Sequence, residues 1–281
     1  IGAYGNDANG SSSGHVRIYD YNGSAWVQVG ADIDGEAASD QSGESVSISS
    51  NGSRVAIGAW LNDGTSSSIN DNRGHVRIYD YNGSAWVQVG EDIDGEAASD
   101  NSGQSVSISS DGSRVAIGAY GNDGNGLNSG HVRIYDYNGS AWVQVGADID
   151  GEAGSDNFGY RVSMSSDGSR VAIGAIGNDE NGNLSGHVRI YQYNNNSWSQ
   201  LGADIDGEAQ GDQSGRSVSM SSDGSRVAIG APYNNGNGSN SGHVRIYDYN
   251  GSAWVQVGAD IDGEAAGDVS GDSVSISSDG S

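Results

Sequence analysis

The sequence repeats itself about every 56 residues, and this periodicity restricts the possible folds more than any other feature. A repeat of this length is one supersecondary unit, which buries its apolar face only by stacking on neighbouring copies. An insertion between Gly64 and Arg73 sets the first two copies slightly further apart than the others. The motif Gly-His-Val-Arg-Ile-Tyr marks each copy and begins at Gly14, Gly74, Gly130, Gly186 and Gly242.

Each copy contains four short segments in which apolar residues alternate with small or polar ones, a pattern typical of β-strands. In the first complete copy these segments are 45–50, 54–59, 75–81 and 85–93. The joints between the first and second segments, and between the third and fourth, are Asn-Gly or Asp-Gly, which suit the positive φ angles of type I′ hairpins. Four antiparallel strands per copy predict the blade of a β-propeller.

The predicted fold is therefore an all-β, five-bladed β-propeller that forms one domain over residues 1–281. The expected blades are 35–94, 95–150, 151–206, 207–262, and 263–281 joined with 1–34. In this last blade a strand at 273–278 would join the N-terminal strands and close the ring without free edges. The alternative is an open arc, or a ring with more blades, taken from a longer array. Because Ile1 aligns with the middle of a strand, we expect a processed product or part of a longer chain.

The composition excludes two classes of function. The 12 basic residues, all Arg, stand against 37 acidic residues and give a net charge of −25 at pH 7. Nucleic-acid binding is excluded because it requires cationic groups that displace the counterions of phosphates. A membrane span is not predicted because the sequence has no apolar run of about 18 residues. The absence of cysteine leaves the redox compartment undetermined.

The repeated motifs resemble the FG-GAP repeat, the propeller repeat of integrin α-chains, and more closely its relatives in secreted algal and marine bacterial proteins. The motifs that name this family occur once each, as Phe158-Gly159 and as Gly230-Ala231-Pro232. The resemblance covers the whole chain and implies a β-propeller with an extracellular or cell-surface location. Integrin-type propellers have seven blades, however, and their Asp-rich calcium loop between the first two strands is replaced here by a tight turn. The calcium site of that family is therefore not carried over.

A second repeated motif, Asp-Ile-Asp-Gly-Glu followed by a further Asp, supplies 20 of the 37 acidic residues. Alternating carboxylates around a glycine can gather oxygen ligands around Ca²⁺, the one cofactor that the sequence suggests. The alternative is that these side chains cap backbone N–H groups in a turn between blades. The residues are Asp32, Asp34, Glu36, Asp40, Asp92, Asp94, Glu96, Asp100, Asp148, Asp150, Glu152, Asp156, Asp204, Asp206, Glu208, Asp212, Asp260, Asp262, Glu264 and Asp268.

Aromatic residues recur at two places in the repeat. One tryptophan per copy lies on the fourth strand and is expected to pack between blades, with stacking on a sugar as the alternative. Aromatic residues in the loop after the second strand are candidate ligand-binding residues, with packing at the blade rim as the alternative. The tryptophans are Trp26, Trp86, Trp142, Trp198 and Trp254, and the loop residues are Tyr4, Trp60, Tyr120 and Tyr233.

All five histidines occupy one position at the start of the third strand: His15, His75, His131, His187 and His243. They are too far from the axis to converge on one ion, so each is expected to be a hydrogen-bonded structural residue. Nine Asn-x-Ser sequons are candidate N-glycosylation sites, although turn chemistry explains several of them without a sugar. The sequons are at Asn9, Asn22, Asn51, Asn82, Asn138, Asn183, Asn195, Asn237 and Asn250.

Repetition also shapes the expected function. Catalysis by a triad or a carboxylate pair needs one asymmetric constellation, whereas every Ser, His and Asp of interest recurs in equivalent settings. Symmetry is broken at a few loop positions such as 158–161 and 232–233. The sequence therefore predicts no enzyme but an extracellular structural or adhesive module, such as a subunit of a surface layer or filament. The alternatives are a multivalent lectin-like propeller and a calcium-binding adhesion domain. The expected partners are proteins or glycans at the acidic loop face, or further copies of the chain.

Overall fold

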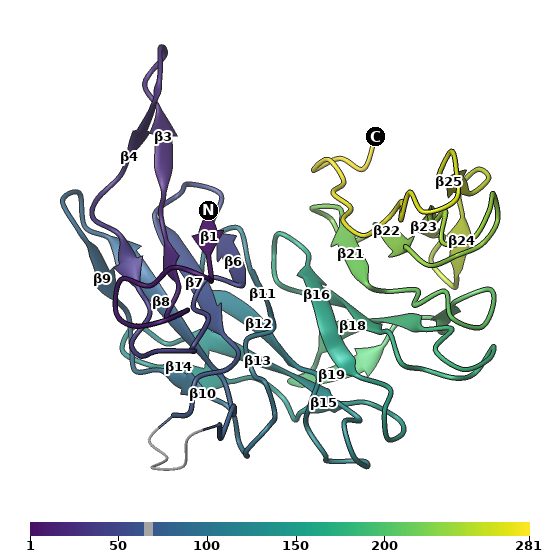
Figure 1. Ribbon diagram of the computed structural model, residues 1–281, viewed down its shortest axis with the longest axis horizontal. Coiled ribbons are helices and arrows are strands. Elements are labelled where there is room, and N and C mark those ends of the chain that lie inside the picture. Colours follow the sequence, from purple (N-terminus) through teal and green to yellow (C-terminus); the bar gives the residue numbers. More distant parts are fainter. Residues whose placement is uncertain (65–69) are drawn as a thin grey trace.

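The computed structural model describes residues 1–64 and 70–281, which form β-strands and loops without any helix (Figure 1). Part of the insertion noted between Gly64 and Arg73 lies outside the described residues. Among the described residues there is accordingly no helical segment that could cross a lipid bilayer.

The four complete repeats each form one antiparallel sheet, in which the first three strands pair in order and two short strands pair with the third. The first strands are β6 (Ser45–Ile48), β11 (Ser105–Ile108), β16 (Phe158–Met164) and β21 (Ser217–Met220). The second strands are β7 (Arg54–Ala59), β12 (Arg114–Ala119), β17 (Arg170–Ala175) and β22 (Arg226–Ala231). The third strands are β8 (His75–Tyr81), β13 (His131–Tyr137), β18 (His187–Asn194) and β23 (His243–Tyr249). The short strands are β9 (Trp86–Gln88) and β10 (Ile93–Asp94), β14 (Trp142–Gln144) and β15 (Ile149–Asp150), β19 (Ser197–Gln200) and β20 (Ile205–Asp206), and β24 (Trp254–Gln256) and β25 (Ile261–Asp262).

The predicted fourth strand, 85–93 in the first complete repeat, is divided in two in the structure. The division falls at Gly90, whose φ of 79° is readily adopted only by glycine. Both pieces pair with the same third strand, β9 with its second half and β10 with its first half. As a result Asp94 lies directly opposite His75 in the sheet. This break brings the acidic motif next to the histidine.

Neighbouring sheets pack a small face against a branched face, as the alternating pattern predicts. Val115 and Ile117 of β12 join a cluster with Ala56 of β7 in the preceding repeat. On the other side of β12, Ala116 packs with Val162 and neighbouring residues of the following repeat. The first strands of successive repeats contact one another, and the sheets follow an arc in sequence order (Figure 1). The repeats therefore form one propeller-like stack whose core lies between the sheets.

Polar side chains reinforce each contact between repeats. Nε1–H of Trp142 donates to the carbonyl of Val89 in the preceding repeat at 2.9 Å. Trp86, Trp198 and Trp254 make the equivalent bond, so these tryptophans pack between blades as predicted. In the opposite direction, Nη1 of Arg54 donates to the carbonyl of Gly112 in the following repeat at 2.9 Å.

The N-terminal strands form an incomplete repeat. β1 (Gly2–Ala3), β2 (His15–Val16) and β5 (Ile33–Asp34) make a three-stranded sheet, and β3 (Tyr19–Tyr21) pairs with β4 (Trp26–Gln28). The predicted closure of a blade with 273–278 is not formed in the structure. This segment instead lies along the preceding repeat, where Ile276 N–H donates to Ser219 Oγ at 3.1 Å. A complete first strand pairs with its second strand at four positions, whereas β1 is only two residues long and offers half of that ladder. The five-bladed ring stays a prediction.

One glycine on each second strand allows the repeats to approach closely. A Cβ atom at Gly118 would lie 2.0 Å from the carbonyl oxygen of Gly159 in the following repeat. Equivalent contacts occur at Gly58, Gly174 and Gly230. The spacing between repeats is thus limited by backbone atoms on both sides.

We predict that Gly118→Ala lowers the free energy of unfolding by about 2 kcal/mol or more, because the methyl group forces two backbones apart. Gly5→Ala is the matched control, since a Cβ at Gly5 meets nothing within 4 Å. Denaturant titration of both variants checks this. Equal stability of the two variants would contradict the packing described above.

Candidate functional site

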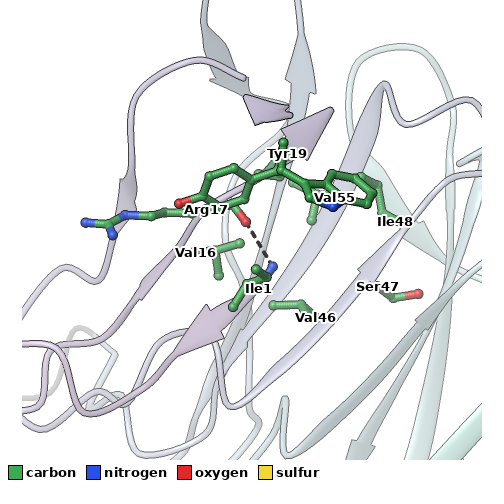
Figure 2. Close-up of a pocket in the computed structure, with 10 residues that line it drawn as sticks. Ile1, Val16, Arg17, Tyr19, Val46, Ser47, Ile48 and Val55 are labelled. Carbon is green, nitrogen blue, oxygen red and sulfur yellow. Dashed lines mark hydrogen bonds between the residues drawn. The ribbon is translucent and has the colours of Figure 1, made fainter. Parts of the chain in front are cut away.

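An apolar groove of about 550 Å³ lies at the N-terminal end of the stack, lined by Ile1, Val16, Val46 and Ile48 among others (Figure 2). Val46 and Ile48 are 39% and 46% exposed, whereas the equivalent Val106 and Ile108 are 7% and 8% exposed. At that interior contact the preceding repeat covers both residues. The groove is therefore an uncovered packing face between repeats and not a site with its own chemistry.

Polar residues gather instead at the interior junctions. At three junctions the glutamate of an acidic motif reaches the histidine of the following repeat, where that repeat's own first Asp also lies. We call each such set of one Glu, one His and one Asp a junction cluster. The three junction clusters are Glu36, His75 and Asp92; Glu96, His131 and Asp148; and Glu208, His243 and Asp260.

The three junction clusters have closely similar geometry. His243 Nδ1 lies 3.8 Å from Glu208 Oε2 and 3.7 Å from Asp260 Oδ2. The corresponding distances are 3.9 and 3.7 Å at His75, and 4.0 and 3.9 Å at His131. These separations are too long for hydrogen bonds. Each imidazole thus faces two carboxylates without a direct bond to either.

The three imidazoles are buried, and burial lowers the pKa of two of them, His75 and His131. His75, His131 and His243 are each 1% exposed. Burial, with a smaller contribution from the nearby Arg77 charge, lowers the pKa of His75 to about 4. At His243 neither ring nitrogen has a hydrogen-bond partner. The prediction that every histidine is a hydrogen-bonded structural residue is therefore wrong for His243, because its ring is held against carboxylates that lie too far away to bond.

An arginine two positions after each histidine lies beside the cluster. Arg77 Nη2 donates to the carbonyl of Asp34 at 2.7 Å, and its Nη1 is 3.5 Å from Glu36 Oε1. Burial raises the pKa of Glu36 despite this positive charge. A cavity of about 120 Å³ adjoins the cluster, lined by Glu36, Asn62, Gly64, His75, Asp92 and Asp94. This volume accommodates a small ion or a few water molecules.

The junction of the second and third complete repeats is filled differently. Here Arg189 Nη2 donates to Asp204 Oδ2 at 2.7 Å and also forms a close ion pair with Glu152. His187 Nδ1 is 3.9 Å from Asp204 Oδ2. Glu180, which stands where other repeats have Gly64, Gly124 and Gly236, lies in the same group. At this junction a guanidinium lies between the two carboxylates.

The structure divides each predicted set of four acidic residues. The first Asp and the Glu of a motif belong to different junctions, and the last Asp has another role. Asp40 Oδ2 accepts hydrogen bonds from Ala37 N–H and from Asn62 Nδ2, both at 3.0 Å. Asp100, Asp156, Asp212 and Asp268 accept the equivalent backbone bond, as the capping alternative predicts. The four acids of one motif therefore do not surround a common point.

The candidate ligand-binding aromatics form part of a row. The ring centroids of Trp60 and Tyr120 are 6.2 Å apart, and those of Tyr120 and Tyr160 are 5.8 Å apart. Arg216 lies over Tyr160 and over Tyr233, at 5.7 and 5.5 Å from the ring centroids. In the sequence, the segment 158–161, which contains Tyr160, was noted only as a break in symmetry, and Arg216 was not identified. Both residues lie at a position whose residue changes from copy to copy. Tyr4 lies outside these ring contacts and is 52% exposed.

The sequons lie in different surroundings. Asn22 and its counterparts in hairpin turns use Oδ1 to accept from the backbone two residues later, which leaves the amide nitrogen outward. By contrast, the amide nitrogens of Asn9 and Asn237 donate to the carbonyls of Gly35 and Gly263. Glycosylation stays a prediction, and it would break a hydrogen bond at Asn9 and at Asn237.

Stacked four-stranded sheets with the same contact at every step define the chain as a β-propeller repeat protein. The family model described as the FG-GAP repeat matches residues 93–135, 147–191 and 203–247. The chain therefore belongs to the FG-GAP repeat family. No curated protein is similar enough in sequence to match this chain.

Two solved structures are similar in fold. The periplasmic gluconolactonase PpgL of Pseudomonas aeruginosa superposes with a TM-score of 0.57 at 14% identity. The match covers 89% of this chain but only 65% of that enzyme. A putative 6-phosphogluconolactonase from Bacteroides uniformis has a TM-score of 0.44 at 11% identity, over 84% of this chain and 79% of that one. At 14% identity the likeness to PpgL establishes the fold alone.

The comparison corrects the function expected from the sequence. The expectation of a non-enzymatic structural or adhesive module, with its lectin-like and calcium-adhesion alternatives, rested on the premise that repeated residues serve symmetry and not chemistry. This premise is wrong as an exclusion of catalysis, since a protein with a similar propeller fold is an enzyme, a gluconolactonase. Broken symmetry is present as well, in the row from Trp60 to Tyr233 and at Arg189.

We predict that the free energy of unfolding depends on pH through His75. Its pKa is about 4 in the folded chain against an ordinary value of 6.5, so the unfolded chain binds the proton more readily. The contribution of His75 to the free energy of unfolding is therefore fully present above pH 6.5. It falls as the pH drops towards 4, by ~1.4 kcal/mol for each unit of pKa difference. The raised pKa of Glu36 has the opposite effect: the folded chain binds this proton more readily, so the contribution of Glu36 to stability falls as the pH rises through its titration.

Chemical denaturation of the wild type and of His75→Gln, both in a chelator, checks this. The variant should lose less stability than the wild type between pH 6.5 and 4, while the difference between them stays constant from pH 7 to 8. Parallel pH profiles over the whole range would contradict the prediction.

Proposed function

We propose that this protein is a hydrolase that opens cyclic esters of sugar acids, and that the junction clusters are its reaction sites. One observation carries the proposal: a buried, uncharged imidazole and two carboxylates face one another without hydrogen bonds at His75, beside a cavity large enough for water. A carboxylate or imidazole that is free to accept a proton can act as a general base.

The proposed chemistry needs only groups at the junction. A water in the cavity would give a proton to His75 Nδ1 as its oxygen attacks the carbonyl carbon of the lactone. Arg77 would stabilise the negative charge on the former carbonyl oxygen. When the ring C–O bond breaks, the leaving oxygen takes the proton from the imidazolium, and the products are a carboxylic acid and a hydroxyl group. The acid then gives its proton to solvent water and becomes a carboxylate. Atoms and charge balance, and the imidazole returns to its starting state.

The surface beside the cluster supports the choice of substrate. Asp92 and Asp94 line both the small cavity and a groove of about 490 Å³, whose wall includes Tyr135 and Trp142. Aromatic faces and carboxylates suit a ring that carries many hydroxyl groups. The gluconolactonase that shares the fold acts on such a compound by its name. That enzyme is periplasmic, so we also propose that this chain is exported and lies at the cell surface or outside the cell.

We predict that the chain releases acid from glucono-1,5-lactone faster than the buffer does, measured by titration at constant pH. Because the sites are repeated, the test variant combines His75→Asn, His131→Asn and His243→Asn. Its rate above the buffer background should fall by a factor of about 10². His187→Asn is the matched control, since Arg189 already fills that junction. A wild-type rate equal to the buffer rate, or an unchanged rate in a folded triple variant, would refute the proposal.

A further inference from the structure

We propose that each of the three junction clusters binds one first-row divalent cation of the Mn²⁺ or Zn²⁺ type, and that Arg189 supplies the positive charge at the junction of the second and third complete repeats. The inference concerns the same residues as the proposed function but a different state of them, because an Nδ1 atom that ligates a metal cannot accept a proton. The hydrolase proposal applies to the cluster without an ion. Its ligands would be the imidazole Nδ1, one oxygen of the Glu and one oxygen of the Asp.

The spacing of the three atoms suits one ion. Atoms that each lie about 2.1 Å from a metal can be at most about 4.2 Å apart. His243 Nδ1 lies 3.7 and 3.8 Å from its two carboxylate oxygens, and the other clusters fall between 3.7 and 4.0 Å. All three atoms of each cluster lie within 4.8 Å of one another, so small side-chain shifts would bring them within bonding distance of one ion. The remaining coordination positions would be open to water.

The buried imidazole is the second observation. His243 is 1% exposed, and its Nδ1 has no hydrogen-bond partner although it points at two carboxylates. A buried nitrogen without a partner costs free energy. A protonated imidazole does not resolve this arrangement, since a distance of 3.7 Å is too long for a hydrogen bond. A bound cation satisfies all three groups at once.

The junction that contains Arg189 allows a comparison within the same chain. The His-Val-Arg-Ile sequence is the same in every repeat, yet Arg189 bridges Glu152 and Asp204, whereas Arg77 turns to a backbone carbonyl. Burial opposes the charge on Arg189, but the two carboxylates raise its pKa above the ordinary value. The guanidinium therefore occupies the position between the two carboxylates that is open at the other junctions. An extra carboxylate, Glu180, accompanies this change.

The mixture of ligands selects the kind of ion. Ca²⁺ prefers six to eight oxygen ligands, and a buried imidazole contributes none. One imidazole nitrogen with two carboxylates suits Mn²⁺ or Zn²⁺. The inference therefore differs from the calcium site that the acidic motif suggested, both in the residues and in the ion.

The test counts metal on the full chain. Protein stripped with a chelator is dialysed against Zn²⁺ or Mn²⁺ in excess Ca²⁺, and bound metal is measured by mass spectrometry. We expect about three ions per chain, one for each junction cluster. His243→Asn should lower the count by one, and the matched control His187→Asn should leave it unchanged. Arg189→Gln should raise it towards four by opening the remaining junction.

The outcomes are decisive. A count that His243→Asn does not change, or metal that Ca²⁺ displaces fully, would overturn the inference. The result is also separable from the proposed function. Three bound ions after dialysis, without lactone hydrolysis by the stripped protein, would retain the inference and refute the function. Lactone hydrolysis by protein that takes up no metal on dialysis would do the reverse.

Discussion

Direct contact between the backbones of neighbouring repeats is the constraint on which the structure depends. Gly118 lies against Gly159, and the same contact recurs at each complete repeat. Because no side chain separates the backbones there, the sheets are close enough for Val115 and Ile117 to reach the small face of the preceding sheet. The same closeness brings a glutamate of one repeat to the histidine of the next. The contact between backbones thus determines both the packing of the core and the assembly of the candidate site.

Much of the fold was predictable from the sequence, because alternation, hairpin dipeptides and the repeat length are local signals. The interior strands, their order within a sheet and the packing of Trp142 all follow from such signals. Two features were not predictable in this way. The division of the fourth strand depends on Gly90, whose φ was not evident from the pattern. Closure of the ring depends on a ladder between distant segments, for which the repeat pattern contains no local signal.

The sequence identified the residues of the candidate site but not their association. The sequence marked the acidic motif and the histidines but treated them separately, as a calcium loop and as structural residues. Their association depends on the contact between repeats, since Glu208 and His243 belong to different copies. Asymmetry was equally hidden. Glu180 replaces a glycine in a loop, and only the three-dimensional arrangement connects that change with the position of Arg189.

The hydrogen bonds between repeats also have a direction. Tryptophan donates backwards along the chain and arginine donates forwards, so the two sides of a repeat differ but complement each other at every step. A gene that encodes such copies can gain or lose a whole unit by unequal recombination, because the new neighbours meet through the same pair of surfaces. The number of units is then free to vary among descendants, while a shift by any other length would place mismatched surfaces together.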